Sequence, residues 1–197
     1  MRTIRTVFAL VVLAFAGPAL AAGAPEDVVK DATGKIQALI KQHKDEYAHD
    51  KKKFYKAVDE VVAPAFDVPY VAQITLGRFW RAANDGQRTR FQAAFKDTLI
   101  HAYSDALLEY SDSSSVDWGR ATVNGDTATI HATILRRGNQ PAALGFELHK
   151  VTGGDWRAFD ISIEGVSLIT NFRSQFSSEV KQKGLDALIQ RLEGGSV

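Results

Sequence analysis

Apolar residues recur with a helical period through the first half of the chain and with a strand period through the third quarter. The helical half predicts a first helix at Glu26–Gln42, a second from Asp50 to Val62 and a short third at Val68–Leu76. Asp67 is well placed to cap the start of the third helix, and Gly77 to end it.

The longest helical pattern begins at Asp85 and extends to about Tyr110. Its apolar positions keep the helical spacing throughout. They are Phe91, Phe95, Leu99, Ala102, Ala106 and Tyr110. We expect this helix to be the spine of the domain.

From Val116 onward the hydrophobic period changes to two, which is typical of half-buried strands. Strands are expected at Val116–Val123, Thr127–Arg136, Ala142–Val151 and Trp156–Ile163. A helix is then predicted from Val166 to about Lys183, and another over Leu185–Leu192. Helices segregated around an antiparallel sheet define the α+β class, here a meander of about four strands cupped by several helices.

Side-chain alternation assigns a face of the sheet to each strand residue. In the last strand, one face would carry Phe159, Ile161 and Ile163, and the other Trp156, Ala158, Asp160 and Ser162. His131 and His149 lie opposite the apolar set of their strands, so we expect both to be exposed.

Residues 1–21 have the form of an export signal. Arg2 and Arg5 precede the apolar run Val7–Ala16, and Ala19-Leu20-Ala21 offers a small-residue cleavage site. The run is shorter than the ~20 apolar residues that span a bilayer, which disfavours the alternative of a retained anchor. We expect residues 22–197 to form a single soluble domain, exported to the bacterial periplasm.

Charge and cysteine content narrow the functional classes. The formal net charge is +1, and removal of the two signal arginines would bring it to −1. A balance this close to zero argues against a nucleic-acid partner. The absence of cysteine excludes thiol catalysis, thiolate metal sites and lipoprotein anchoring.

Catalytic motifs find little support. The five histidines lie on separate predicted elements and lack metal-ligand spacing. Ser167 follows Gly165-Val166, but the second glycine of a nucleophile elbow is missing. Asp160 and Glu164 are expected to have structural roles. We therefore predict neither an enzyme nor a bound metal or cofactor.

The segment Lys41–Lys56 is rich in lysine. It fits either a solvated helix face or a surface that contacts anionic groups.

Two blocks of sequence resemble the MlaC family, periplasmic phospholipid-transport proteins also called toluene-tolerance auxiliary proteins. One block is Phe159–Ile169 followed by Asn171–Phe176, and the other is Pro64–Asp67 followed by Leu76–Arg81. Phe79 and Phe172 stand where relatives often carry Tyr. The resemblance extends over essentially the whole chain after the signal.

The resemblance implies a soluble carrier that holds a glycerophospholipid by its acyl chains. The chains would enter an apolar pocket between sheet and helices, with the headgroup near solvent. Such a carrier moves lipid between an inner-membrane ABC transporter with an MCE-domain subunit and an outer-membrane lipoprotein associated with a porin, which maintains outer-membrane lipid asymmetry. We expect a monomer whose only small-molecule partner is this cargo.

Family-like position and inward parity together suggest the pocket wall. The helical candidates are Val68, Val71 and Ile74, then Leu99, Tyr103 and Leu107. The sheet candidates are Ile130, Ile134, Phe146 and Leu148, and the last segment adds Val166 and Ile169. Hydrophobic pattern alone fits a filled core as well as a pocket, so a lipid acyl hydrolase and a lipid-free adaptor or chaperone remain as alternatives.

Overall fold

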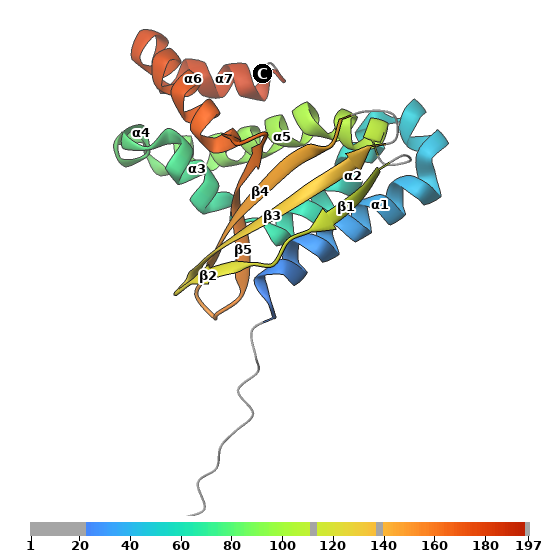
Figure 1. Cartoon of the computed structure of the whole chain (residues 1–197). Coiled ribbons are helices and arrows are strands. Elements are labelled where there is room, and N and C mark those ends of the chain that lie inside the picture. The colour runs from blue at the N-terminus through green and yellow to red at the C-terminus, as the bar shows by residue number, and fades with distance from the viewer. Residues whose placement is uncertain (1–22, 111–113, 137–139, 196–197) are drawn as a thin grey trace, which may run out of the picture.

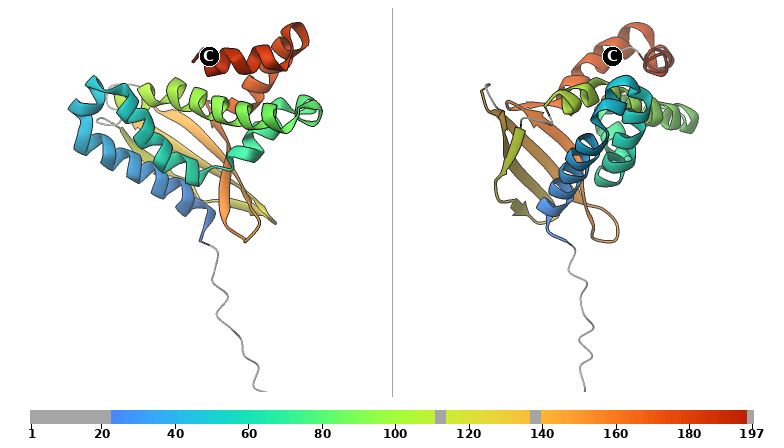
Figure 2. Two further views of the ribbon diagram at one scale, coloured as in Figure 1. Left: turned by 180° about the vertical axis from the view of Figure 1, so that it is seen from behind. Right: turned by 90° about the vertical axis from the view of Figure 1, so that its right-hand side faces the viewer.

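The chain folds into a layer of helices packed against one antiparallel sheet. In the computed structural model, which describes residues 23–110, 114–136 and 140–195, the two layers are seen side on in Figure 2. The helices are α1 (Pro25–His49), α2 (Lys51–Val62), the 3-10 turn η1 (Ala63–Ala65), α3 (Val68–Leu76), α4 (Arg78–Ala82), α5 (Asp85–Tyr110), α6 (Leu168–Lys183) and α7 (Leu185–Glu193). The strands are β1 (Ser114–Trp118), β2 (Thr122–Asn124), β3 (Thr127–Arg136), β4 (Ala142–Lys150), β5 (Trp156–Ile163) and β6 (Val166–Ser167).

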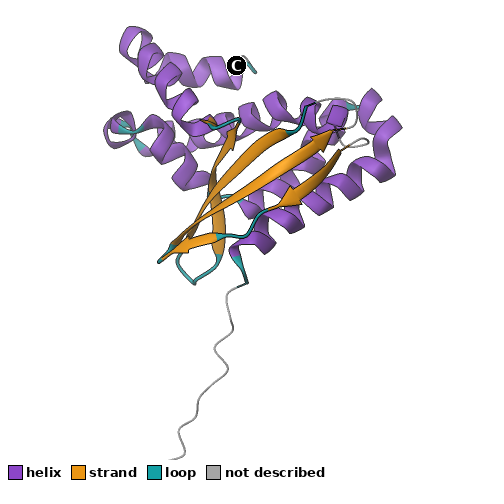
Figure 3. Cartoon of the chain, in the orientation of Figure 1, coloured by secondary structure: helices purple, strands orange, loops and turns teal. Residues whose placement is uncertain are grey.

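The sheet has six strands in the order β1-β3-β4-β5-β6, with β2 also paired to β3 (Figures 1 and 3). The predicted α+β class and meander are confirmed, but the number of strands is larger than expected. One reason is that the predicted strand Val116–Val123 is divided at Gly119. The Gly119 N–H donates to the His131 carbonyl oxygen at 2.8 Å, and a Cβ at Gly119 would lie 2.8 Å from that oxygen. This close approach needs a glycine.

A β-bulge in β5 changes which side chains face the helices. Leu148 of β4 pairs with Ala158, whereas Glu147 pairs with Asp160, so Phe159 is the extra residue. Trp156 and Ala158 consequently face the same side as Leu148, and Ile161 beyond the bulge faces the same side as Phe146. The predicted division of this strand into two faces is therefore wrong for Trp156 and Ala158. It is also wrong for Phe159, whose ring packs against Tyr70 and His149 and is separated from Ile161.

The joint between β5 and α6 also differs from the prediction. Val166 pairs with Ile163 in β6, so the helix begins at Leu168 and not at Val166. Ser167 caps the helix, because its hydroxyl oxygen accepts from the Thr170 N–H at 3.0 Å. The Asp160 carboxylate accepts from the Ser167 hydroxyl at 2.5 Å and from the Ile169 N–H at 3.2 Å. Asp160 thereby ties α6 to the sheet.

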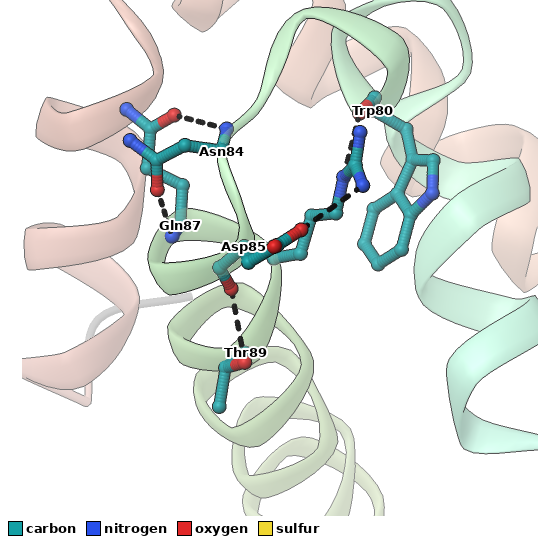
Figure 4. A network of polar contacts seen from close by, with 6 residues as sticks. Trp80, Asn84, Asp85, Gln87 and Thr89 are labelled. Carbon is teal, nitrogen blue, oxygen red and sulfur yellow. Dashed lines mark hydrogen bonds and ion pairs between the residues drawn. The ribbon is translucent and has the colours of Figure 1, made fainter.

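Helix ends follow local signals closely. Helix α3 spans the predicted residues: Asp67 accepts from the Tyr70 N–H at 3.1 Å, and Gly77 ends the helix with φ of 55°. Helix α5 begins one residue after Asn84, in a capping box that was not predicted (Figure 4). The Asn84 side chain accepts from the Gln87 N–H at 2.8 Å, and the Gln87 side chain accepts from the Asn84 N–H at 3.1 Å.

His149 is half-buried, against the expectation of exposure, whereas His131 is exposed as expected. The His149 ring lies 4.5 Å from the Tyr70 ring and 5.3 Å from the Phe159 ring, centroid to centroid. Its Nε2 lies 2.9 Å from a carboxylate oxygen of Asp67. Helix α3 therefore covers part of the outer sheet face, which strand parity could not show.

The interior divides into three apolar clusters. The helical cluster joins α3, α5, α6 and α7, and its centre is a group of four phenylalanine rings, Phe91, Phe95, Phe172 and Phe176. The sheet cluster joins β3, β4 and β5 to the start of α1. The third cluster lies between α1, α2 and α5. In the part of the chain that the structure describes, no helix has the length and hydropathy needed to cross a membrane.

An ion pair between α6 and α7 makes the stability of the helical cluster depend on pH. Arg191 donates to both carboxylate oxygens of Glu179, with Nε–Oε1 at 2.9 Å and Nη2–Oε2 at 2.8 Å. These bonds hold the pKa of Glu179 below its ordinary value of 4.5. A depressed carboxyl pKa stabilises the fold above the ordinary pKa, and that contribution is lost as pH falls through the lowered pKa.

We expect Glu179→Gln to lower the free energy of unfolding at pH 7 by about 1 kcal/mol, because a charge-assisted pair is lost at a partly buried position. The difference from the unsubstituted protein should narrow as pH falls below 4.5 and close once pH has fallen through the lowered pKa of Glu179. Urea unfolding at a series of pH values measures both. The control Glu60→Gln alters a side chain that is 68% exposed and should leave stability unchanged at every pH; a pH-independent deficit in Glu179→Gln would contradict the assignment.

Candidate functional site

The candidate site is the apolar inner face of the sheet, which we define as the face that carries Ile130 and Phe146. Strand register places its side chains in rows across β1, β3, β4 and β5. The rows are Ala128–Leu148–Ala158, then Ile130–Phe146–Ile161, then Trp118–Ala132–Leu144–Ile163, then Val116–Ile134–Ala142. These rows form a continuous apolar surface.

Cover over this surface decreases steadily from the first row to the last. In the first row, Leu148 and Ala158 are completely buried. In the third row, Leu144 is half-buried and Ile163 is 37% exposed. In the last row, Ile134 is also only half-buried. We call the first row the closed end of the inner face and the last row its open end.

The closed end is covered by the start of α1 and by Phe66. Val29 is 3% exposed and packs into the sheet cluster, with Val28 beside it. Phe66 packs against both the sheet cluster and the helical cluster, and it forms a bridge to Ala158. The Asp67 N–H donates to the Ala158 carbonyl at 2.9 Å, and this bond fixes the neighbouring Phe66 over the closed end. The two layers are thus joined at the closed end.

Helix α5 crosses the end of the sheet where β3 and β5 terminate (Figures 1 and 2). Leu99, Tyr103 and Leu107 recur at the four-residue spacing of one helical stripe. Leu99 and Tyr103 are half-buried against the helical cluster, and Leu107 is 39% exposed. Helix α5 packs mainly on α7, α2 and α3, so this stripe is not part of the apolar cluster of the sheet. Exposure therefore increases along this stripe from Leu99 to Leu107, as it does along the inner face from the closed to the open end.

Tyr103 brings the one hydroxyl group of this stripe. Burial raises the pKa of its phenol above the ordinary value of 10.0. Tyr103 is thus a polar group with part of its surface removed from water, in mainly apolar surroundings.

The structure brings part of the predicted wall together. Ile130, Ile134, Phe146 and Leu148 share the inner face, and Leu99, Tyr103 and Leu107 share the stripe on α5. Val71, Ile74 and Ile169 pack in the helical cluster, against which Leu99 and Tyr103 also pack. Val68 is half-buried in the first turn of α3, and Val166 is 59% exposed in β6.

Several residues of the inner face or of its cover were absent from the predicted wall. Val116, Trp118, Leu144 and Ile161 lie on the face, and Val28, Val29 and Phe66 cover its closed end. Period-two alternation could have found Val116 and Trp118, whose ring centroid lies 5.7 Å from that of Phe146. Phe66 belongs to the block Pro64–Asp67 of the family resemblance, but no local pattern places it over the sheet, because that position depends on a bridge to a distant strand.

Two surface depressions lie away from the open end of this face. One, of about 270 Å³, lies at the start of α1, where Val28 and Trp156 at the closed end form part of its lining, and the other, of about 360 Å³, lies between α5 and α7. None of the predicted wall residues lines either of them. Among the described residues, no cluster of His, Asp or Glu is arranged to hold a metal ion.

Comparison with known proteins finds one matching family and relatives that align with most of this chain. The sequence profile of a family described as MlaC protein matches residues 30–194. Toluene tolerance protein ttg2D of Pseudomonas putida is 29% identical over 90% of this chain and 83% of its own length. The intermembrane phospholipid transport system binding protein MlaC of Haemophilus influenzae is 22% identical over 95% of this chain and 90% of its own.

A solved structure shares the fold. It is a phospholipid-binding protein from Ralstonia solanacearum in complex with a phospholipid. The two superpose with a TM-score of 0.79 and 28% sequence identity, over 88% of this chain and 97% of that one.

Proposed function

Because this chain belongs to the MlaC family, we propose that it is a phospholipid carrier that holds acyl chains between the inner face of the sheet and the α5 stripe. The observation that carries the proposal is the loss of cover along the inner face. Ile134, Leu144 and Ile163 are apolar and face the helices, yet they are half-buried or exposed. A solid core would bury them, whereas acyl chains would complete their cover.

The relatives support this cargo. The Ralstonia solanacearum protein, which has the same fold at 28% identity, carries a phospholipid. The relative from Haemophilus influenzae is named as a phospholipid transport binding protein. The open end, where the cover is least, is the natural place for a headgroup because polar groups there keep their contact with water.

The energetics explain why a carrier is needed. Each buried methylene contributes ~0.8 kcal/mol, so two chains of about fifteen methylenes would cost about 24 kcal/mol to leave in water. Escape of free lipid from a membrane is correspondingly slow. A carrier with an apolar wall on two sides lowers this cost without having to recognise the headgroup.

We place the carrier in the periplasm, after cleavage of a signal at residues 1–21. There it would exchange lipid with an inner-membrane ABC transporter bearing an MCE-domain subunit and with an outer-membrane lipoprotein–porin complex. Its role would be to maintain the lipid asymmetry of the outer membrane. The name of the Haemophilus influenzae relative, an intermembrane transport system binding protein, supports this assignment.

Native mass spectrometry of the purified mature chain tests the cargo. We expect species heavier than the polypeptide by phospholipid masses, and the same phospholipids after denaturing extraction. A lipid-free mass with nothing extracted would overturn the carrier and favour a lipid-free adaptor. Release of fatty acid from phospholipid on incubation would instead indicate a hydrolase, although the Ser167 hydroxyl is already engaged in capping α6.

A further inference from the structure

We propose that the Glu164 side chain is a clasp that holds β4 and β5 together at the open end of the inner face, and that breaking it speeds the exchange of bound lipid. This inference rests on the proposed carrier function and concerns the regulation of the same site. It starts from a backbone outlier, Glu164, that lies beside the exposed apolar residues Ile163 and Val166.

Glu164 has a backbone conformation that its side chain disfavours. Its φ is 51°, and among the described residues it is the only one other than glycine with a positive φ. Glu164 and Gly165, whose φ is 77°, form a two-residue turn between the paired residues Ile163 and Val166. Asn-Gly is the preferred sequence for a hairpin turn with two positive φ values, because asparagine tolerates the left-handed region better than glutamate. The local chemistry of the turn therefore does not explain a glutamate at this position.

A contact with a neighbouring strand does explain it. The Ala143 N–H of β4 donates to the Glu164 carboxylate at 2.8 Å, and the Glu164 N–H donates to the Ala143 carbonyl oxygen at 2.9 Å. In a regular antiparallel pair, both such bonds join backbone to backbone. Here the carboxylate accepts in place of a backbone carbonyl, so the ladder continues one residue beyond Ile163, where β5 ends. A strained residue held by such a contact points to a functional constraint.

The clasp lies toward the open end of the inner face. Strands β4 and β5 pair as far as Leu144 and Ile163, in the third row, and Ala143 is the next residue of β4 toward the last row. The segment Ile163–Val166, which we call the tip, exposes 37% of Ile163 and 59% of Val166. With the clasp broken, the tip can move away from Leu144 and widen the exit for acyl chains.

The opening stays local because a second contact anchors the start of α6. The Asp160 carboxylate accepts from the Ser167 hydroxyl and from the Ile169 N–H, and neither bond involves a residue of the tip. The bond between Glu164 and Ala143 is instead exposed. An exposed hydrogen bond breaks at little cost, because water replaces the lost partner. The tip therefore lies between a fixed anchor and a bond that opens readily.

Two substitutions of Glu164 separate the hydrogen bond from the charge. Glu164→Gln keeps the length of the side chain and an oxygen that accepts, so the clasp should persist. Glu164→Asn suits the turn but is one methylene shorter, so the bond to Ala143 should be lost. Each protein is loaded with a phospholipid that has a fluorescent acyl chain and is mixed with excess phosphatidylcholine vesicles that contain a quencher. Stopped-flow fluorescence then measures the rate of lipid release.

We expect Glu164→Asn to release lipid about two- to tenfold faster than the unsubstituted protein, which is the factor by which one net hydrogen bond changes an equilibrium. Glu164→Gln should release lipid at the unsubstituted rate. Amide hydrogen exchange should be faster at Ala143 in Glu164→Asn and unchanged in Glu164→Gln. The amide of Phe146, in the middle of β4, should exchange equally slowly in all three proteins, which shows that the sheet itself is intact.

Equal release rates in Glu164→Asn and the unsubstituted protein would overturn the clasp while leaving the carrier intact. An equal acceleration in Glu164→Gln would also overturn it, because the charge and not the hydrogen bond would then control release. Failure of the unsubstituted protein to take up the phospholipid would overturn both the clasp and the proposed carrier function.

Discussion

Ile134→Asp should reduce the phospholipid retained by the purified protein at least tenfold while the protein stays folded. Ile134 lies at the open end of the inner face and is only half-buried, so a carboxylate there keeps contact with water in the lipid-free protein. With acyl chains bound, the same carboxylate would be desolvated without a partner, which is strongly unfavourable. Native mass spectrometry measures the retained lipid, and circular dichroism confirms the fold.

Leu135→Asp is the matched control, because Leu135 is adjacent in β3 but faces the opposite side of the sheet and is 45% exposed. It introduces the same charge and should leave the bound lipid unchanged.

Phe146→Asp is a less informative variant than Ile134→Asp, although strand parity places both residues on the inner face. Phe146 is 7% exposed and packs beside Trp118, so a carboxylate there should unfold the sheet cluster as well as disturb the lipid. If Ile134→Asp stays folded and retains all of its lipid, the acyl chains do not lie against this part of the inner face.

Phe95→Ala should lower the free energy of unfolding by about 3–5 kcal/mol. Phe95 is 1% exposed, and its ring centroid lies 5.2–5.4 Å from those of Phe91, Phe172 and Phe176. Truncation leaves a cavity in the centre of the helical cluster, where α5 and α6 meet, and the surrounding rings can fill it only in part. The loss is a large fraction of the stability of an ordinary domain.

Urea unfolding of the lipid-free protein measures this effect. Val123→Ala is the control, because Val123 is 53% exposed in β2 and its truncation should change stability by less than about 0.5 kcal/mol. A destabilisation below about 1 kcal/mol in Phe95→Ala would show that the four rings do not form the centre of this cluster. Lipid bound to the inner face should stabilise the unsubstituted protein and Phe95→Ala equally, since Phe95 does not line that face.

Local interactions are the part of this structure that the sequence predicts best. The bounds of α3 follow from Asp67 and Gly77, which act within one turn of the helix. The alternation of β3 and β4 placed Ile130, Ile134, Phe146 and Leu148 on one face, because side-chain direction in a regular strand depends only on parity. The family resemblance, carried by two short blocks, was confirmed by a profile match over residues 30–194.

Features that depend on distant contacts were predicted wrongly or missed. The bulge at Phe159 arises in the pairing of β5 with β4, and it reverses the faces of Trp156 and Ala158. The burial of His149 depends on α3 reaching the outer face of the sheet. Strand parity contains no information on either contact.

By itself, the sequence determined the fold class, the ends of several helices and the apolar face of the central strands, because these depend on neighbours within a few residues. The tertiary structure decided how far that face is covered. Val29 and Phe66 close one end of it, while α5 rests on other helices and leaves Ile134 and Ile163 partly uncovered. The same apolar pattern would suit a filled core. The packing of the helices, which no local pattern specifies, leaves this face partly uncovered, and that incomplete cover is what supports the proposal of a wall for acyl chains.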